Sequence, residues 1–382
     1  MIYLDNCATT KPDPQVVKAM VEALEQNFAN PSSLHSFGHK IEKEMETMRG
    51  SLASLLGAEE DEIYFTSGGT ESNNIAIHGL IDKNKRKGRK IITTSIEHSS
   101  ILDQFRHYEQ QGYEVVYLSV DGQGRIDRKQ LLDEIDDQTI VVSLFHVHNE
   151  LGTINPLKEI INEIRQKNKD LLIHGDGVQA CGKIKIDLHE LGIDTYSVSS
   201  HKIYGPKGIG GLYLRRGLDI SSLVIGGGQE KGLRSGTENI PGIFGFGRAC
   251  QLAQKDFKKR YDHAVTLRHH LLELLKRHLD RYQINSPEEG SPYIISISIE
   301  DTRGEVLLHY LEGDEIYIST ASACSSHGTK RSNTLDHIGL SDNLADGTIR
   351  ICTCKDTTTD DLDQFVKALA NYVYDIRQIM GR

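Results

Sequence analysis

The sequence lacks a long hydrophobic run, an excess of positive charge and a dense set of cysteines. No uninterrupted apolar stretch approaches the ~20 residues that a helix needs to cross a bilayer. The first five residues contain an acid and no basic segment ahead of an apolar core, which is not the pattern of a signal peptide. We therefore expect neither a membrane span nor a cleaved secretory signal.

The charge balance and the cysteine count narrow the class of protein further. The formal net charge is −10, which argues against a protein that binds nucleic acid through bulk electrostatics. Six cysteines are scattered through 382 residues, unlike the disulfide framework of a small secreted domain. The composition is typical of a globular protein from a reducing cytoplasm, without nucleic acid or a membrane as direct partner.

Strand-like and helix-like patterns alternate along most of the chain. Seven short apolar runs, many of them β-branched, lie between residues 63 and 214, and amphipathic segments separate most of them. This alternation predicts an α/β fold with a mostly parallel sheet flanked by helices. We predict a large domain over residues 14–255. A smaller α+β domain would combine residues 1–13 with 256–382.

Polar side chains follow several of the predicted strands. Lys202 follows a strand-like run within a cluster of hydroxyls and a histidine, which suits a lysine that forms a Schiff base. Asp176 ends another run, where a carboxylate can pair with a protonated pyridine nitrogen. His98 ends a third and could transfer protons. The carboxyl ends of parallel strands are where such folds bind ligands. Each residue alone also fits an ordinary surface or cap position.

Three further segments carry candidate chemistry. Gly69 and Thr70 lie in a glycine-rich turn that opens a helix, where backbone N–H groups can hold a phosphate. Cys324 lies within small residues, and we predict a mobile loop over about residues 319–333. Arg350 lies in a strand-like run and could bind a carboxylate with two hydrogen bonds. A capping box, an idle thiol and a structural ion pair are the alternatives that these patterns leave open.

Together and in this order, the motifs resemble the NifS/IscS branch of the cysteine desulfurases, which are fold-type-I pyridoxal-phosphate enzymes. The resemblance runs from Tyr3 to about Arg350. The segments that carry it are NPSSLHSFG at 30–38, FTSGGTESNN at 65–74, DGVQ at 176–179, SHKIYGPKG at 200–208, RSGTEN at 234–239 and SAC at 322–324.

The resemblance implies a role for each matching position. Lys202 would bind the cofactor aldehyde and move the Cα proton of the substrate, His98 would stack on the ring, and Cys324 would accept sulfur. Arg350 and Asn149 would bind the substrate. The remaining residues implied to bind pyridoxal 5'-phosphate are Gly69, Thr70, Asn149, Asp176, Gln179, Ser199, Ser200, His201 and, from the second subunit, Thr237.

The implied reaction is removal of sulfur from L-cysteine, which gives L-alanine and a persulfide on Cys324. The implied partners are a second copy of the chain, in a homodimer, and a sulfur-acceptor protein for Fe–S cluster assembly or for tRNA or cofactor thiolation. A selenocysteine lyase and a non-catalytic sulfur-transfer scaffold are the alternative functions. The intact set of Lys202, Asp176 and His98 argues against the scaffold.

The sequence departs from the family pattern at three places. His148 stands where asparagine is usual, and with His146 it raises the question of a metal site, although we expect none because two histidines are too few. Cys352 and Cys354 replace common serine and glycine; packing, a second sulfur relay or a cluster site are the alternatives, with packing favoured. Cys7 stands where alanine or serine is common, and the sequence assigns it no role.

Overall fold

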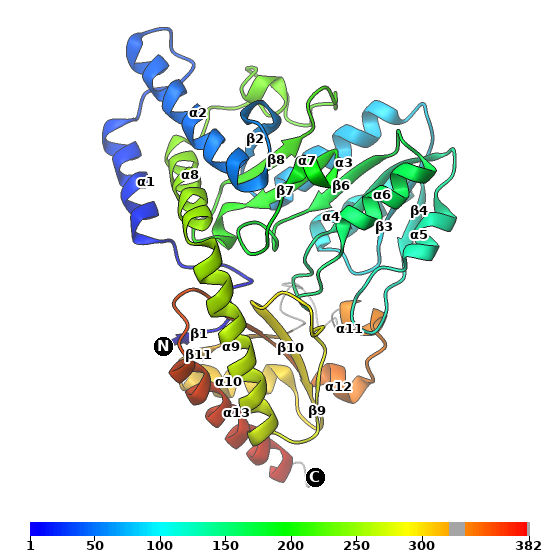
Figure 1. Ribbon diagram of the computed structural model, residues 1–382, viewed down its shortest axis with the longest axis vertical. Helices are drawn as coiled ribbons and strands as arrows, with labels where there is room; N and C mark the ends of the chain where they lie inside the picture. Colours follow the sequence, from blue (N-terminus) through cyan, green and yellow to red (C-terminus); the bar gives the residue numbers. More distant parts are fainter. Residues whose placement is uncertain (321–332, 380–382) are drawn as a thin grey trace.

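The computed structural model describes residues 1–320 and 333–379, and its larger part is built around one central sheet (Figure 1). The sheet has seven strands in the order β2-β8-β7-β6-β5-β3-β4. These strands are β2 (Ile63–Thr66), β3 (Lys90–Thr94), β4 (Glu114–Leu118), β5 (Thr139–Phe145), β6 (Leu172–Asp176), β7 (Thr195–Ser199) and β8 (Gly210–Leu214). Strands β4, β3, β5, β6 and β7 pair in parallel, whereas β8 is antiparallel to both of its neighbours. The predicted α/β fold with a mostly parallel sheet is confirmed.

Helices cover both faces of this sheet because its strands are apolar on both sides. Successive side chains of a strand point to opposite faces. Accordingly, Ile91 packs into a cluster with helices α3 (Gly69–Asn84) and α4 (Ser99–Gln110), and its neighbour Ile92 packs into a second cluster on the other face. That second cluster includes side chains from α2 (Ser36–Leu56), α6 (Leu157–Lys167) and α8 (Ile240–Lys255). The sheet therefore lies between two layers of helices. Short α5 (Arg128–Glu134) and α7 (Leu188–Leu191) complete this part.

The first helices begin and end where their capping residues predict. Helix α1 (Pro14–Gln26) starts after Asp13, whose carboxylate accepts a hydrogen bond of 2.9 Å from the Gln15 N–H, and Pro14 is its first residue. Helix α2 ends at Gly57, which has φ of 63°, in the left-handed region that glycine adopts without steric cost. Sequence rules therefore suffice for these boundaries.

The smaller part of the molecule follows α8 at Asp256 and lies below the first in Figure 1. It contains a four-stranded sheet in the order β12-β13-β10-β9 and a two-stranded sheet of β1 with β11. Its elements are α9 (Phe257–His278), β9 (Tyr282–Ile284), β10 (Ile294–Ile299), α10 (Gly304–Gly313), β11 (Ile316–Tyr317), β12 (Ser319–Thr320), α11 (Asn333–His337), α12 (Asp342–Asp346), β13 (Thr348–Cys352) and α13 (Thr359–Ile379).

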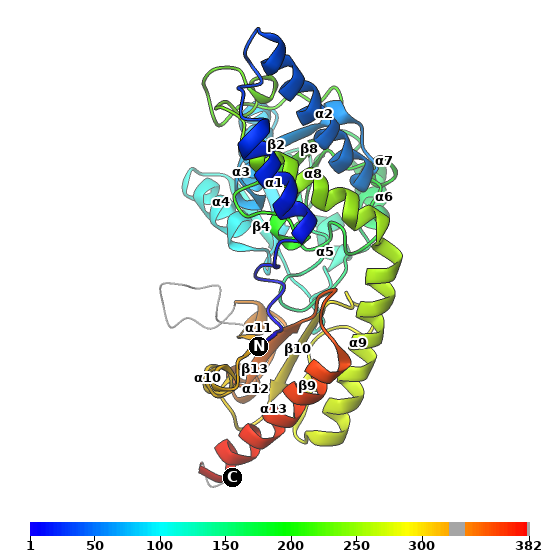
Figure 2. The same ribbon diagram turned by 90° about the vertical axis from the view of Figure 1, so that its left-hand side faces the viewer.

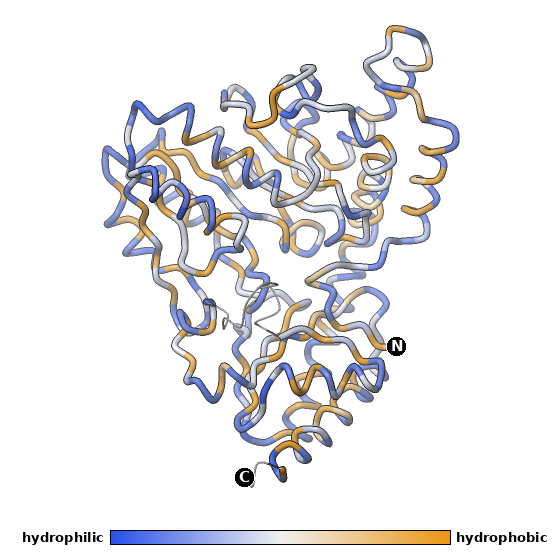
Figure 3. The backbone as a smooth tube through the Cα atoms, turned by 180° about the vertical axis from the view of Figure 1, so that it is seen from behind, coloured by the Kyte–Doolittle hydropathy of each residue, from blue (hydrophilic) through white to orange (hydrophobic). Residues whose placement is uncertain are grey.

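Two long helices cover one side of the smaller sheet. Helices α9 and α13 pack against each other, and Figure 2 shows both on the same side of the strands. Hydrophobic and hydrophilic residues alternate along α13, which leads to the C-terminus marked in Figure 3, as is typical of a helix with one buried face. In α9 the buried face includes Leu267, Leu271 and Leu275, none of which is exposed.

The first strand belongs spatially to the smaller part. Strand β1 (Ile2–Tyr3) pairs in parallel with β11, and the Cys352 N–H donates a hydrogen bond of 2.6 Å to the Leu4 carbonyl. This arrangement supports grouping residues 1–13 with the C-terminal part, and we keep the domain boundaries at 13/14 and 255/256 as a proposal. Among the described helices, none is both long enough and apolar enough to cross a membrane.

The predicted loop over 319–333 is wrong at both ends. Ser319 and Thr320 form strand β12, because they pair in antiparallel register with Arg350 and Ile349 of β13. Asn333 begins α11. The predicted sulfur acceptor Cys324 lies outside the described residues.

Candidate active site

The ends of the parallel strands meet at a cavity of about 420 Å³ between the two parts of the molecule. Most of the predicted site residues reach it from different elements of the large sheet, and Arg350 reaches it from β13 on the opposite side. The predicted residues that line the cavity are Gly69, Thr70, His98, Asn149, Asp176, Gln179, Ser199, His201, Lys202 and Arg350. This convergence of polar groups at a sheet edge is where α/β folds bind ligands.

Lys202 stands at the end of a short 3-10 turn, Ser200–Lys202, which follows β7 directly. Its Nζ donates a hydrogen bond of 2.9 Å to the Ala8 carbonyl and another to the Cys7 carbonyl. These two carbonyls belong to the segment after β1, so the N-terminal residues orient the lysine that ends β7. The amine is thus held at the cavity wall within reach of a bound aldehyde.

Asp176 ends β6 and is held by two hydrogen bonds. One carboxylate oxygen accepts a bond of 2.9 Å from the Val178 N–H, and the other accepts a bond of 2.9 Å from the Asn73 amide. The same amide nitrogen donates to the Ser100 hydroxyl at 2.9 Å. Ser100 in turn lies 2.8 Å from Nδ1 of His98. Asn73 and Ser100 therefore link the carboxylate to the histidine by continuous hydrogen bonds.

His98 caps the start of α4, and its ring faces the cavity. Burial among protein atoms lowers the pKa of His98, and the charge of Lys202 acts in the same direction although Asp176 opposes it. Because Nδ1 accepts a hydrogen bond of 3.1 Å from the Ser100 N–H, the neutral ring carries its proton on Nε2. The ring is therefore neutral and fixed in one tautomer.

A site that can bind an anion lies at the start of α3. Gly69 and Thr70 occupy the first turn of this 16-residue helix, where backbone N–H groups have no partner within the helix. A Cβ on Gly69 would come within 2.5 Å of Val178 Cγ2, so a side chain here would not fit. The Ser199 hydroxyl is buried at the cavity without a hydrogen-bond partner among the described residues. These donors suit a phosphate.

Arg350 projects from β13 and is almost fully buried. Its guanidinium donates 2.9 Å hydrogen bonds to the Asn149 carbonyl and to the Asp5 carboxylate. Burial alone would lower the pKa of Arg350, but its electrostatic interactions with Cys352, Cys7 and Asp5 raise that pKa above its ordinary value. Its Nε is buried and has no partner among the described residues. A permanently charged arginine with a donor to spare suits a carboxylate ligand.

Three predicted site residues are not on this cavity wall. Ser200 is fully buried behind it, against Gly205, and does not line the cavity. Thr237 is exposed and lies outside the cavity of its own chain. Cys324 lies outside the described residues. Their predicted roles remain predictions.

Several cavity residues could not be assigned from the sequence. Asn73 lies within a helix and Cys7 follows β1, and neither has a motif of its own. Glu97 precedes His98; burial raises its pKa well above the ordinary value, and the charge of Asp176 adds to this. Glu97 is therefore a neutral acid that is buried near Asp176. The feature of the sequence that indicates Glu97 is its position directly before His98, after a strand-like run.

His148 has a structural explanation. Its Nε2 donates to the Ile96 carbonyl at 2.9 Å, and its Nδ1 accepts from the Glu150 and Leu151 N–H groups at 3.2 and 3.1 Å. Burial lowers its pKa to about 4. His146 is bound separately, to the Tyr196 hydroxyl at 2.7 Å. Both rings already have hydrogen-bond partners. The described part of the chain contains no group of three or more His, Cys, Asp or Glu that could hold a metal.

A lysine, an aspartate and a histidine thus lie at one edge of the sheet, beside the first turn of α3, and an arginine lies opposite them across the cavity. The chain belongs to the aminotransferase class-V family, whose family model matches residues 2–365. Enzymes of this family use pyridoxal 5'-phosphate. The predicted membership in the NifS/IscS branch is also confirmed.

Individual relatives are similar over nearly their whole length. A protein of Clostridium botulinum named cysteine desulfurase IscS is 39% identical over 381 residues, which are 99% of this chain and 96% of the relative. A solved structure titled NifS-like protein matches with a TM-score of 0.92 and 37% identity, covering 98% of this chain and 99% of the other. The structure titled SspA in complex with cysteine matches with a TM-score of 0.81 and 32% identity, covering 93% and 99%.

Proposed function

We propose that this chain is a pyridoxal-phosphate-dependent cysteine desulfurase that transfers sulfur from L-cysteine to Cys324. The observation that carries the proposal is the convergence of Lys202, Asp176 and His98 on one cavity, opposite Arg350. The relatives named above support the choice of L-cysteine as substrate.

The residues present fit the cofactor. The first turn of α3 and the unpaired Ser199 hydroxyl supply donors for its phosphate. Asp176, whose two hydrogen bonds keep it oriented, would face the ring nitrogen, and the neutral His98 would lie against the ring. When bound, the cofactor supplies an electron sink that stabilises negative charge at the substrate Cα.

The protein's own groups would carry out the remaining steps. Arg350 holds the substrate carboxylate, which places the Cα–H bond near Lys202. Lys202 then takes the Cα proton and returns a proton during the reaction. The Cys324 thiolate attacks the substrate sulfur, so that a sulfur–sulfur bond forms while the carbon–sulfur bond breaks. L-Cysteine and one thiol thus give L-alanine and one persulfide, without an external oxidant.

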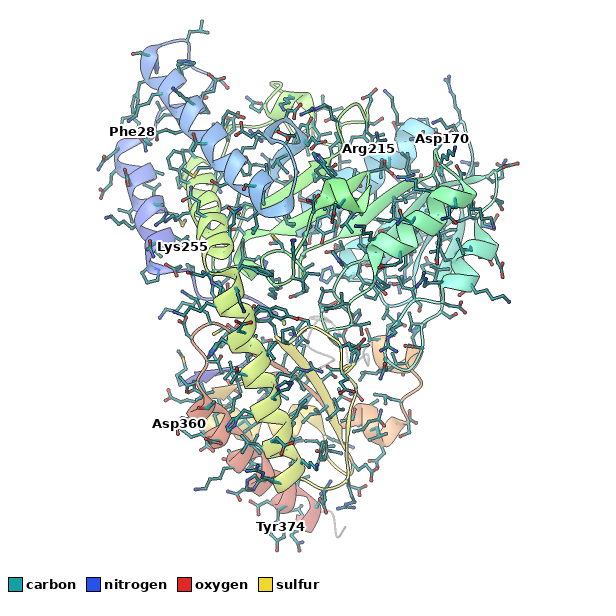
Figure 4. All side chains as sticks on the ribbon, viewed as in Figure 1. Phe28, Asp170, Arg215, Lys255, Asp360 and Tyr374 are labelled. Carbon is teal, nitrogen blue, oxygen red and sulfur yellow. The ribbon has the colours of Figure 1, made fainter. Side chains whose placement is uncertain are left out.

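A homodimer is part of this proposal. Apolar side chains are exposed on α1 and on the segment after it: Leu24 is 62% exposed, and Phe28, at the outer end of α1 in Figure 4, is 73% exposed. A cluster of this kind marks an interaction surface. Thr237 is exposed outside its own cavity, which fits its expected contribution to the site of a second copy.

We also propose a cytoplasmic protein as the acceptor of the persulfide sulfur, in Fe–S cluster assembly or in thiolation of tRNA or a cofactor. The relatives named cysteine desulfurase IscS support a partner that accepts sulfur. The homodimer proposed above is tested by sedimentation of the cofactor-loaded protein. A monomer at micromolar concentration would contradict the homodimer.

The test of the reaction is turnover with L-cysteine and, separately, L-selenocysteine, in the presence of dithiothreitol. We expect L-alanine from L-cysteine, with loss of this activity in Cys324→Ser. Alanine from L-selenocysteine alone would identify a selenocysteine lyase instead. No alanine from either substrate would indicate a scaffold without catalysis.

A further inference from the structure

Two thiols lie together where the N-terminal segment meets β13. Asp5 and Cys352 form a parallel bridge, and the side-chain amide of Asn6 donates to the Cys352 carbonyl at 2.9 Å. Cys7 comes two residues after Asp5, and the two thiols lie close enough for each to affect the pKa of the other. Both are free thiols, 2% and 0% exposed. Two cysteines 345 positions apart in sequence are thus neighbours where these two segments pair.

The surroundings make the two thiols unequal. Burial alone would raise the pKa of Cys7, but the hydrogen bond from Cys352 and the charges of Lys183, Arg350 and Lys202 lower it below its ordinary value. Burial and the charge of Cys7 instead raise the pKa of Cys352 well above its ordinary value. The pair therefore shares one proton, as a thiolate at Cys7 and a thiol at Cys352. A thiolate is the nucleophile in sulfur chemistry.

This pair is connected to both sides of the cavity. Cys7 lines the cavity, and its carbonyl accepts hydrogen bonds from Lys202 Nζ and, at 3.0 Å, from the Gln179 amide. Cys352 is two residues from Arg350 on β13, so the two side chains share a face of the strand. A covalent bond between the two sulfurs would therefore affect the positions of both Lys202 and Arg350.

We propose that Cys7 and Cys352 are a redox-sensitive pair that a hydroperoxide converts to a disulfide within the active site. The Cys7 thiolate attacks one oxygen of the peroxide and the O–O bond breaks. Hydroxide departs from hydrogen peroxide, or alkoxide from an organic hydroperoxide, and Cys7 becomes a sulfenic acid. The Cys352 thiol then attacks the Cys7 sulfur, and water leaves as the S–S bond forms. Two electrons pass from the two thiols to the peroxide. A dithiol reverses the reaction.

The disulfide would weaken binding of an amino-acid carboxylate. The two sulfurs must approach to about 2.05 Å, which moves the Cys7 carbonyl that Lys202 and Gln179 contact. The thiolate charge beside Arg350 also disappears. This consequence rests on the proposed function, whereas formation of the disulfide does not.

The chain contains its own control pair. Cys181 and Cys250 are both fully buried in the core of the large part, and Cys181 is close enough to affect the pKa of Cys250. Burial raises the pKa of both thiols. Without a thiolate, this pair should resist the same oxidant.

The test is to treat the cofactor-loaded protein with hydrogen peroxide, block free thiols after denaturation, and map the cysteines by mass spectrometry. We expect a Cys7–Cys352 cross-linked peptide that dithiothreitol removes and that forms at least tenfold faster than any link between Cys181 and Cys250. In Cys352→Ser, Cys7 should remain a sulfenic acid that dimedone traps. The proposal is overturned if Cys7 and Cys352 stay reduced while the half-buried Cys354 is oxidised, or if Cys7 pairs with another cysteine.

The consequence is measured in Cys324→Ser, which removes the thiol of the predicted acceptor. L-Alanine, which cannot reduce a disulfide, is titrated while the visible absorption of the bound cofactor is followed. We expect oxidation to weaken binding about tenfold or more, with recovery after dithiothreitol. Unchanged binding despite the disulfide overturns the coupling to the active site. No response to L-alanine in either redox state contradicts the proposed function, while the peptide map still decides whether the disulfide forms.

Discussion

The two walls of the cavity are built differently. The wall from the large sheet takes its residues from the ends of several adjacent strands, and hydrogen bonds through Asn73 and Ser100 join Asp176 to His98. The opposite wall takes Arg350 from β13 and Asp5 and Cys7 from the segment after β1. The first wall holds groups that hydrogen bonds orient, which suits a cofactor, and the second holds opposite charges in contact, which suits a charged substrate. We therefore propose that the large sheet holds the cofactor, whereas β13 and the segment after β1 recognise the substrate.

Lys202→Ala should have the largest effect, because it removes the proton-transfer group from the cofactor wall. We expect kcat for L-alanine formation from L-cysteine to fall by roughly 10³-fold. Circular dichroism should show an intact fold, since the lysine makes its two hydrogen bonds at the cavity and not in the core. Retention of more than a tenth of the activity would contradict the role of Lys202.

Arg350→Lys should affect the substrate wall selectively. The charge remains, but the forked donors to the Asn149 carbonyl, the Asp5 carboxylate and a ligand cannot all be replaced. We expect KM for L-cysteine to rise on the order of 10- to 100-fold, with a smaller change in kcat. Arg49→Lys is the matched control, because Arg49 is equally buried and bound to Glu230 at 2.7 Å outside the cavity. It should lower stability and leave KM unchanged.

Asn73→Ala should weaken the cofactor wall without touching the substrate wall. The change removes one of the two hydrogen bonds that hold Asp176. It also removes the contact of 3.0 Å between the Asn73 carbonyl oxygen and Nε2 of the buried His174. We expect a loss of stability of about 1–3 kcal/mol and a fall in kcat of about tenfold, with KM nearly constant. Asn84→Ala, on the same helix, removes a bond to a backbone carbonyl only. If both variants lose kcat equally, Asn73 has no positioning role.

His148→Asn should change the pH dependence of stability rather than catalysis. The pKa of His148 is about 4 in the folded protein, below the ordinary value of about 6.5, so the unfolded chain binds this proton first. The contribution of His148 is complete above pH 6.5 and is lost as the pH falls toward 4. Without it, the free energy of unfolding should depend on pH less steeply by about 1 kcal/mol per pH unit near pH 5. Denaturant titrations of the wild type and the variant at pH 5 and 7 would reveal this difference. The same change in the free energy of unfolding between the two pH values in both proteins would contradict the prediction.

The sequence predicts the cofactor wall better than the substrate wall, for a physical reason. Lys202, Asp176 and His98 each follow an apolar run, and the parallel sheet brings such strand ends together. Cys7 and Arg350 meet only because β1 and β13 join the same small domain, which no local pattern indicates. The run of small residues around Ser319 predicts a loop, because nothing in it indicates the pairing of Ser319 with Arg350. Asn73 carries its role through hydrogen bonds that a helical pattern does not encode.

The most direct test of the central claim is a single turnover with L-cysteine, followed by mass mapping of the persulfide in the wild type and in Cys324→Ser. We expect one L-alanine per active site and a persulfide on Cys324 that is absent from the variant. L-Alanine with the persulfide on Cys352 or Cys354 would keep the reaction but contradict the assigned acceptor. Absence of both L-alanine and persulfide from the cofactor-loaded wild type would contradict the function itself.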